Sequence, residues 1–241
     1  MLSQVAILAA DTCRSRIYLQ HLRSKGLVPS FALVLSQASD RHLLTNIDKE
    51  ILREDNKYSY NLETPVCEIL ENFGVPYQTI TCDDPNSTSC QSPIKNLNQK
   101  WIVYSGPGGK ILSKETLNLG KKFLHAHPGL LPAYKGSTTI YYSLLAEGFC
   151  GVSAFIMDEK IDNGPIIIQR KFPPPVDRRN IDLFYDSYIR AELLAEVLPT
   201  LDKPEMKILP QGENTKSQTY HVIHPILKSI AIYGKKSEKN L

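Results

Sequence analysis

The stretch KKFLHAHPGLLPAYKG (residues 121–136) and the stretch MDEKIDNGP (residues 157–165) decide how this chain of 241 residues is interpreted. The first begins as a short apolar strand and places two histidines, His125 and His127, at its carboxyl end, before a loop rich in Pro and Gly. The second carries a carboxylate, Asp162, in a turn closed by Asn-Gly-Pro. Ligands of open α/β sheets bind beyond the carboxyl ends of the strands. The two stretches therefore predict a site where a His and an Asp handle protons at neutral pH.

Apolar strands alternate with helices along most of the chain, which predicts an α/β fold with a doubly wound, mainly parallel sheet. The expected strands are residues 4–10, 31–35, 77–81, 101–104, 123–127, 152–157 and 166–170. The expected helices are residues 13–25, 65–73, 138–146 and 180–201, with a surface helix and mobile flanks within 37–63. Pro204 ends this unit, so residues 1–204 are expected to form the catalytic domain and 205–241 a short C-terminal extension.

The composition is that of an ordinary soluble globular protein, with 42% hydrophobic and 22% charged residues. The net charge of +3 is small and the Lys and Arg residues are dispersed, which argues against a nucleic acid partner. No window of 18 apolar residues free of charge indicates a membrane span. The N-terminal apolar run lacks the basic region of a secretory signal and is expected to be the first strand.

The cysteines are odd in number and scattered, at Cys13, Cys67, Cys82, Cys90 and Cys150. None forms a Cys-x-x-Cys pair, and no set of Cys and His has the spacing of a zinc site. We therefore expect reduced thiols, no structural metal and a cytoplasmic location.

The two stretches resemble the signature of the folate-dependent formyltransferases, which reads approximately Asn-x-His-Pro-Ser-Leu-Leu-Pro, Arg/Lys-Gly, Gly-Val-(Ser/Thr) and Asp-(Thr/Asn/Ala)-Gly. In the same order this chain has His125-Ala-His127-Pro128-Gly129-Leu130-Leu131-Pro132, Lys135-Gly136, Gly151-Val152-Ser153 and Asp162-Asn163-Gly164. The ordered match covers about 40 residues, and the α/β pattern extends it over most of the first 200. Two positions depart from the family pattern, because His125 replaces its Asn and Gly129 replaces its Ser.

The resemblance implies a formyltransferase-type, Rossmann-like domain with three catalytic residues. His127 would donate a hydrogen bond to the developing oxyanion, and Asp162 would orient its imidazole and favour its charged form. His125 would replace the amide of the family Asn as a neutral hydrogen-bond donor. The alternatives are that His125 is structural or that transfer activity has been lost.

The resemblance also implies where the substrates bind. The residues expected to line the slot for the folate pterin are Gly109, Lys110, Ile111, Leu112, Leu130, Leu131, Asp158 and Ile161, with turn chemistry and core packing as the alternative for each. The residues expected near the acceptor are Tyr134, Lys135 and Tyr141, for which packed or solvated side chains are the alternative. Loop 105–112 alone matches no phosphate-binding motif. Family members can carry a cis peptide bond before the residue that matches Pro132.

The acceptor is inferred by elimination among the family's branches. Only 79 of the 241 residues follow Asp162, which after a final helix leaves too few for the basic β-barrel of methionyl-tRNA formyltransferases. We expect an N-formyltransferase that moves a formyl group from 10-formyltetrahydrofolate to a nucleotide-linked amino sugar in glycan biosynthesis. The alternatives are an enzyme like the methionyl-tRNA or glycinamide ribonucleotide formyltransferases, or a catalytically dead folate-binding protein on this fold.

The expected partners are folate and a small-molecule amino sugar, with no nucleic acid and no membrane. The extension is too apolar for a free tail and too short for its own core, because it contains Val222, Ile223, Ile226, Leu227, Ile230 and Ile232. We expect it to pack on the domain or at a subunit interface, so that it forms a wall of the acceptor site or joins two subunits in a homodimer.

Overall fold

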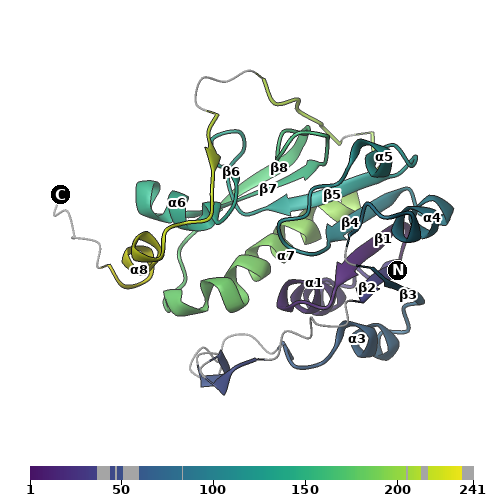
Figure 1. Cartoon of the computed structure of the whole chain (residues 1–241), viewed down its shortest axis with the longest axis horizontal. Helices are drawn as coiled ribbons and strands as arrows, with labels where there is room; N and C mark the ends of the chain where they lie inside the picture. The colour runs from purple at the N-terminus through teal and green to yellow at the C-terminus, as the bar shows by residue number, and fades with distance from the viewer. Residues whose placement is uncertain are drawn as a thin grey trace.

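The computed structural model describes residues 1–36, 44–46, 48–50, 60–82, 84–204, 206–212 and 217–234. Within these ranges one sheet has seven strands, in the order β3-β2-β1-β4-β5-β7-β8 (Figure 1). They are β1 (Leu2–Ala10), β2 (Pro29–Ser36), β3 (Tyr77–Thr81), β4 (Trp101–Ser105), β5 (Lys122–His127), β7 (Cys150–Ile156) and β8 (Ile166–Phe172). The pairings from β3 to β5 are parallel, whereas β7 runs antiparallel to both β5 and β8. The predicted α/β fold with a mainly parallel sheet is confirmed, and each expected strand corresponds to one of these.

Helices cover both faces of the sheet. They are α1 (Cys13–Ser24), α3 (Val66–Asn72), α4 (Thr88–Asn96), α5 (Lys114–Leu117), α6 (Thr139–Glu147), α7 (Asp186–Val197) and α8 (Pro225–Tyr233). Figure 1 shows α1, α3 and α7 on one side of the sheet and α4 and α5 on the other. The strand β1 contributes side chains to the hydrophobic clusters on both faces of the sheet. Val5 and Ile7 belong to the cluster under α1 and α7, while Ala6 and Leu8 belong to the cluster under α4.

The first βα unit shows how the sequence sets an element's limits. Thr12 caps α1, since its hydroxyl accepts a hydrogen bond from the Ser15 N–H at 3.3 Å. The helix is followed by Gly26 with a φ of 73°, a left-handed conformation that glycine adopts without strain. The strand β1, the turn and α1 together bring the start of the helix to the carboxyl edge of the sheet, where a ligand would bind.

Some elements differ from the sequence-based expectation, and one falls mostly outside the described residues. The predicted helix 180–201 is a 3-10 turn (Arg178–Asn180), a π-helical turn (Ile181–Tyr185), α7 and a second 3-10 turn (Leu198–Thr200). The helix α4 was not predicted, because it contains Pro93 and buries only Cys90 and Ile94. Most of the expected surface helix within 37–63 lies outside the described residues.

The helix α4 also corrects the expectation for the cysteines. It brings Cys90 against Cys82 at the end of β3, and the structure joins the two in a disulfide. The remaining cysteines, Cys13, Cys67 and Cys150, are free. The expectation that all five thiols are reduced is therefore wrong for this pair, which could not be recognised without knowing that α4 folds back onto β3.

The C-terminal segment returns to the domain beside β6 and α6 (Figure 1). Its two-residue strand β9 (Thr219–Tyr220) pairs in parallel with β6 (Lys135–Gly136), and Leu209 forms an antiparallel bridge with Ile166. Helix α8 buries Ala231 but leaves Ile226 and Ile230 at least half exposed. The division into a domain and an extension, and the homodimer, stay predictions.

Candidate active site

A cavity of about 150 Å³ lies at the carboxyl edge of β4 and β5, where the parallel part of the sheet meets the antiparallel part. Two loops form much of its lining, residues 107–111 after β4 and residues 157–162 after β7. Between them the cavity is lined by His125, Tyr104, Phe155 and Arg14. We call it the central cavity. It brings together two of the three predicted catalytic residues, His125 and Asp162.

His125 is held as a neutral ring. Its Nδ1 lies 3.3 Å from the backbone oxygen of Tyr104, and its ring packs edge-on against the rings of Tyr104 and Phe155. Burial, followed by the positive charges of Arg190 and Arg14, holds the pKa of His125 well below 6.5. A carbonyl only accepts hydrogen bonds, so Nδ1 carries the proton and the neutral ring keeps a lone pair on Nε2. This makes Nε2 an acceptor, in contrast to the donor expected from the sequence.

His127 lies behind the cavity with both ring nitrogens in contact with the protein. Its Nε2 lies 2.7 Å from the backbone oxygen of Tyr134, and its Nδ1 lies 3.3 Å from Oδ2 of Asp162. The side chain is 3% exposed. Burial lowers the pKa of His127, and the charge of Asp162 opposes that effect without cancelling it. Both nitrogens face oxygen atoms that accept hydrogen bonds, and a neutral imidazole has only one N–H to donate, so His127 has no free donor for a substrate oxygen.

Asp162 is held in one orientation by its neighbours. Its φ is 47°, in the left-handed region that Asp tolerates better than most residues. The Gly136 N–H donates to Oδ2 at 2.8 Å. The turn closes tightly behind it, because a Cβ at Gly164 would come within 1.8 Å of the Ile156 carbonyl oxygen. Among the described residues Oδ1 has no hydrogen-bond partner, and Asp162 is one of the residues that line the central cavity.

Arg14, in the first turn of α1, was not predicted as a site residue. Its Nε donates to Ser105 Oγ at 3.3 Å and its Nη2 to the Gly106 carbonyl. Within the described part of the chain no carboxylate lies within ion-pair distance of its guanidinium, and burial and the charge of Arg190 lower its pKa. Arg14 lines both the central cavity and a second cavity of about 450 Å³ next to α7. Its position just after β1, at the binding edge of the sheet, is the sequence signal that could have found it.

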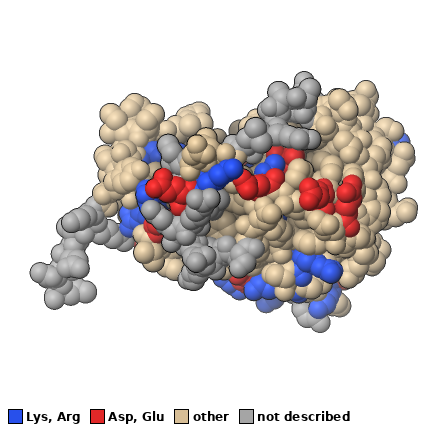
Figure 2. Space-filling view, turned by 90° about the horizontal axis from the view of Figure 1, so that it is seen from below, with Lys and Arg blue, Asp and Glu red and all other residues tan. Residues whose placement is uncertain are grey.

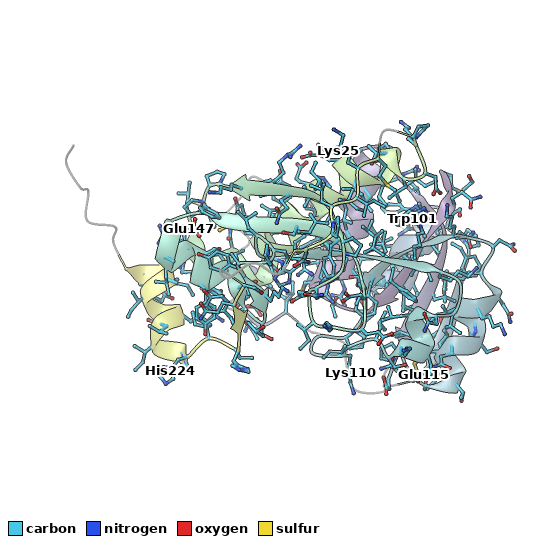
Figure 3. The ribbon with its side chains drawn as sticks, turned by 90° about the horizontal axis from the view of Figure 1, so that it is seen from above. Lys25, Trp101, Lys110, Glu115, Glu147 and His224 are labelled. Atoms are coloured by element: carbon cyan, nitrogen blue, oxygen red, sulfur yellow. A yellow bond between two sulfur atoms is a disulfide. The ribbon has the colours of Figure 1, made fainter. Side chains whose placement is uncertain are left out.

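The structure divides the residues expected to bind folate. Gly109, Lys110, Ile111, Asp158 and Ile161 line the central cavity. Lys110 lies at the outer edge of its loop (Figure 3). By contrast, Leu112 and Leu131 are buried in apolar clusters. Leu130 packs beside Gly151. These three are not in the lining of the cavity, and all eight assignments stay predictions.

The residues expected near the acceptor lie away from the central cavity. Tyr134 donates its hydroxyl proton to Glu147 and stacks on Tyr220. The Lys135 Nζ donates to Asn163 Oδ1 at 2.6 Å, and the Tyr141 hydroxyl donates to Asp182 Oδ1 at 2.8 Å. All three side chains are buried. Their predicted role in binding an acceptor stays a prediction, and their observed contacts are internal to the protein. The cis peptide bond expected between Leu131 and Pro132 is confirmed.

Acidic and basic side chains are interspersed on the face shown in Figure 2, and neither sign forms a continuous stripe across the part drawn in colour. Within the described ranges no three His, Cys, Asp or Glu residues gather as a metal site would need. No helix among the described residues is both long and apolar enough to cross a bilayer.

Residues 72–180 match a family model described as "Formyl transferase". The chain is 34% identical over 131 residues to the methionyl-tRNA formyltransferase of Thermodesulfovibrio yellowstonii. The aligned segment covers 53% of this chain and 41% of that protein. It is 27% identical over 203 residues to the methionyl-tRNA formyltransferase of Ehrlichia ruminantium (strain Gardel). This alignment covers 80% of this chain and 63% of that protein. The chain thus spans less than two thirds of the length of these relatives.

Among solved structures, the fold is similar to an N-formyltransferase from Helicobacter canadensis that was solved with folinic acid and dTDP-3-aminofucose. The TM-score is 0.60 at 17% identity, over 91% of this chain and 71% of that one. It is also similar to a sugar N-formyltransferase from a Shewanella species, with a TM-score of 0.58 at 15% identity, over 95% of this chain and 86% of that one. At these identities the likeness concerns the fold.

Proposed function

Because the chain belongs to the formyl transferase family, we propose that it moves the formyl group of 10-formyltetrahydrofolate to the amine of a nucleotide-linked amino sugar. The observation that carries the proposal is the central cavity. It places His125, Arg14 and the oriented carboxylate of Asp162 around one small space at the binding edge of the sheet. These groups provide a hydrogen-bond acceptor, a cation and a proton acceptor, which is the set that acyl transfer to an amine requires.

The lining of the central cavity fits the ring end of a folate. The side chains of Tyr104, Phe155 and Ile111 offer apolar contact to a flat heterocycle, and two loops bring backbone polar groups to its rim. Its volume of about 150 Å³ suits part of a ligand, since whole small-molecule sites span roughly 300–1,000 Å³. A cavity of about 460 Å³ shares Pro107, Gly108 and Lys110 with it and gives the remainder of the folate a place to lie.

The residues act on the formyl group as follows. The amine nitrogen bonds to the formyl carbon while the bond from that carbon to the folate nitrogen breaks. Oδ1 of Asp162 receives the proton that the amine loses and returns it to the departing nitrogen, so that the carboxylate is regenerated. Nε2 of His125 accepts a hydrogen bond from the amine and directs the nitrogen lone pair. The guanidinium of Arg14 stabilises the negative charge that develops on the formyl oxygen.

The second cavity is the proposed acceptor side. It adjoins the central cavity at Arg14 and Gly108 and contains Arg190, Asp186 and Asp182. Such a mixture of charges is suited to a polar, hydroxylated ligand. The choice of an amino sugar is supported by the likeness of the fold to sugar N-formyltransferases at TM-scores of 0.58 and 0.60. The sequence relatives favour a second candidate acceptor, methionyl-tRNA.

The test is an acceptor screen with the purified chain. Release of tetrahydrofolate from 10-formyltetrahydrofolate is measured with nucleotide-linked amino sugars, glycinamide ribonucleotide and methionyl-tRNA, and products are identified by mass spectrometry. We expect release that depends on an amino sugar, and loss of that release in Asp162→Asn. The matched control is Glu159→Gln, which changes an exposed carboxylate of the same loop. Transfer to methionyl-tRNA alone would establish the second candidate, and folate binding without transfer to any amine would show a catalytically dead protein.

A further inference from the structure

The C-terminal segment contacts the Asp162 turn from two sides. From one side the amide of Gln211 donates to two backbone oxygens of the turn, that of Asp162 at 3.0 Å and that of Gly164 at 2.7 Å. These bonds hold the peptide group between Asp162 and Asn163 and the one between Gly164 and Pro165. The antiparallel bridge between Leu209 and Ile166, with two hydrogen bonds of 2.8 Å, fixes the backbone that leads into Gln211.

From the other side the same segment holds the residue that orients the carboxylate. The Gly136 N–H donates to Oδ2 of Asp162, and Gly136 belongs to the strand that pairs with β9. Hydrogen bonds on either side of it, from Lys135 N–H to the Gln218 carbonyl and from Ser137 N–H to the Tyr220 carbonyl, keep this strand in register. The approach is close: a Cβ at Gly136 would come within 2.1 Å of the Tyr220 oxygen.

We propose that Gln211 is a positioning residue for Asp162, and that Gln211 and Thr219–Tyr220 together form a C-terminal clamp on the catalytic carboxylate. The physical need for a clamp lies in the backbone, because Asp162 has a φ of 47°, a conformation that surrounding contacts must maintain in a residue with a side chain. With both its backbone oxygen and Oδ2 held, only Oδ1 is left to face the substrates. The inference rests on the proposed function, in which that oxygen takes the proton of the amine.

Gln211 is suited to this role by its amide rather than by its charge or packing. One NH₂ group serves both carbonyls, and its Oε1 is buried without a hydrogen-bond partner among the described residues. Gln211→Glu keeps the shape and removes both donors, placing an acceptor against two other acceptors. The turn is then free to relax, and a displacement of about 1 Å in a catalytic group can lower turnover roughly 100-fold.

The first measurement is a double-mutant cycle in the transferase assay. We expect Gln211→Glu to lower kcat about 10- to 100-fold, with little change in the dissociation constant of folinic acid measured by calorimetry. In an Asp162→Asn background, where only residual transfer is expected, the same change should lower the residual kcat by less than about twofold, since interacting residues are not additive. Gln78→Glu, the same chemical change at an exposed position on β3, is the control and should retain wild-type kcat.

The second measurement does not depend on activity. The ¹⁵N resonances of the His127 ring report the contact of Nδ1 with Asp162, which lies at 3.3 Å. If Gln211 positions Asp162, Gln211→Glu shifts these resonances toward those of Asp162→Asn, while Gln78→Glu does not. Wild-type resonances and wild-type kcat in a folded Gln211→Glu variant would overturn the inference. If the wild-type protein transfers no formyl group to any amine, the proposed function fails, and the His127 resonances alone decide whether Gln211 positions Asp162.

Discussion

The Nε2 of His127 lies 2.7 Å from the backbone carbonyl oxygen of Tyr134, and the residue that permits this contact is Gly129. A Cβ at position 129 would lie 2.6 Å from that carbonyl oxygen and 2.9 Å from the imidazole Nε2. The glycine at this position and the buried hydrogen bond are therefore two parts of one arrangement. Gly129 is one of the two departures from the expected motif; the other, His125, lines the central cavity, whereas His127 does not.

We predict that Gly129→Ala loosens this arrangement. The added methyl group forces apart Tyr134 and His127, and such overpacking costs about 1–3 kcal/mol of unfolding free energy. Turnover should fall as well, because the His127 ring supports Asp162. Chemical denaturation and steady-state assays measure the two effects. The control is Gly212→Ala, whose Cβ would meet no atom within 4 Å. Equal stability of both variants would contradict the prediction.

His125 should accept substitution by Asn far better than by Ala. An Asn amide can donate to the Tyr104 carbonyl and present an oxygen acceptor to the cavity, whereas Ala can do neither. We expect His125→Asn to retain substantial activity and His125→Ala, which no longer orients the amine, to lose about 100-fold in kcat. The folinic acid affinity of each variant shows whether the cavity is intact. Near-normal rates for both variants would mean that His125 is structural.

The buried histidines predict a loss of stability in acid. The pKa values of His125 and His127 are lowered from 6.5 by burial, so below pH 6.5 the unfolded chain binds protons that the folded protein does not. The stabilising contribution of the neutral histidines to the unfolding free energy is therefore fully present above pH 6.5. It is lost as the pH falls toward the pKa values that the two histidines have in the folded protein. The slope is at most about 1.4 kcal/mol per pH unit for each histidine.

This effect is measured by urea unfolding at pH 7.5 and pH 5.5. We expect a smaller loss of stability in His125→Asn than in the wild-type protein, because that variant has lost one of the groups that titrate. His221→Asn, at an exposed position, should behave as the wild type does. The explanation would be wrong if His125→Asn lost as much stability as the wild type between the two pH values.

His127 and Asp162 should behave as one unit. The 3.3 Å contact between Nδ1 and Oδ2 means that removing either partner leaves the other misplaced. We expect Ala at either position to lower turnover at least about 100-fold, and the double variant to be little worse than each single one. Circular dichroism verifies folding. A well-folded His127→Ala protein with ordinary activity would refute this mechanism.

The sequence predicted the strands of the sheet and the edge at which the site lies, because apolar strand patterns and a local motif are properties of short segments. It did not predict the contacts from which we infer the role of each residue in the site. The bond between His125 and Tyr104 joins two neighbouring strands, and the bond between His127 and Tyr134 depends on the path of a loop. Gln211 reaches Asp162 across 49 residues of chain, and no local pattern marks that pairing. Such long-range contacts are the basis on which we propose Nε2 of His125 as an acceptor, and its catalytic role stays a prediction.

Arg14 carries the last prediction. Three cations line the central cavity, Arg14, Lys110 and Lys160. Arg14 is the one whose guanidinium is held in place by hydrogen bonds to Ser105 and Gly106, so we assign the developing oxyanion to it. Arg14→Met should therefore lower kcat about 100-fold or more, the usual effect of losing an oxyanion donor. Arg14→Lys should recover part of the loss, since it restores the charge but not the fixed fork of donors.

The control for charge is Arg23→Met, which removes an exposed arginine from the same helix, α1. Thermal unfolding measures the structural part of the effect, because Arg14→Met also removes the hydrogen bonds to Ser105 and Gly106. A catalytic role predicts that kcat still falls at temperatures where the variant remains folded. The affinity for the formyl donor, 10-formyltetrahydrofolate, should also change little, because the charge that Arg14 stabilises develops only during formyl transfer. A normal kcat in Arg14→Met would assign the oxyanion to backbone donors of the 107–111 loop, whereas a rise in the acceptor KM alone would place Arg14 in acceptor binding.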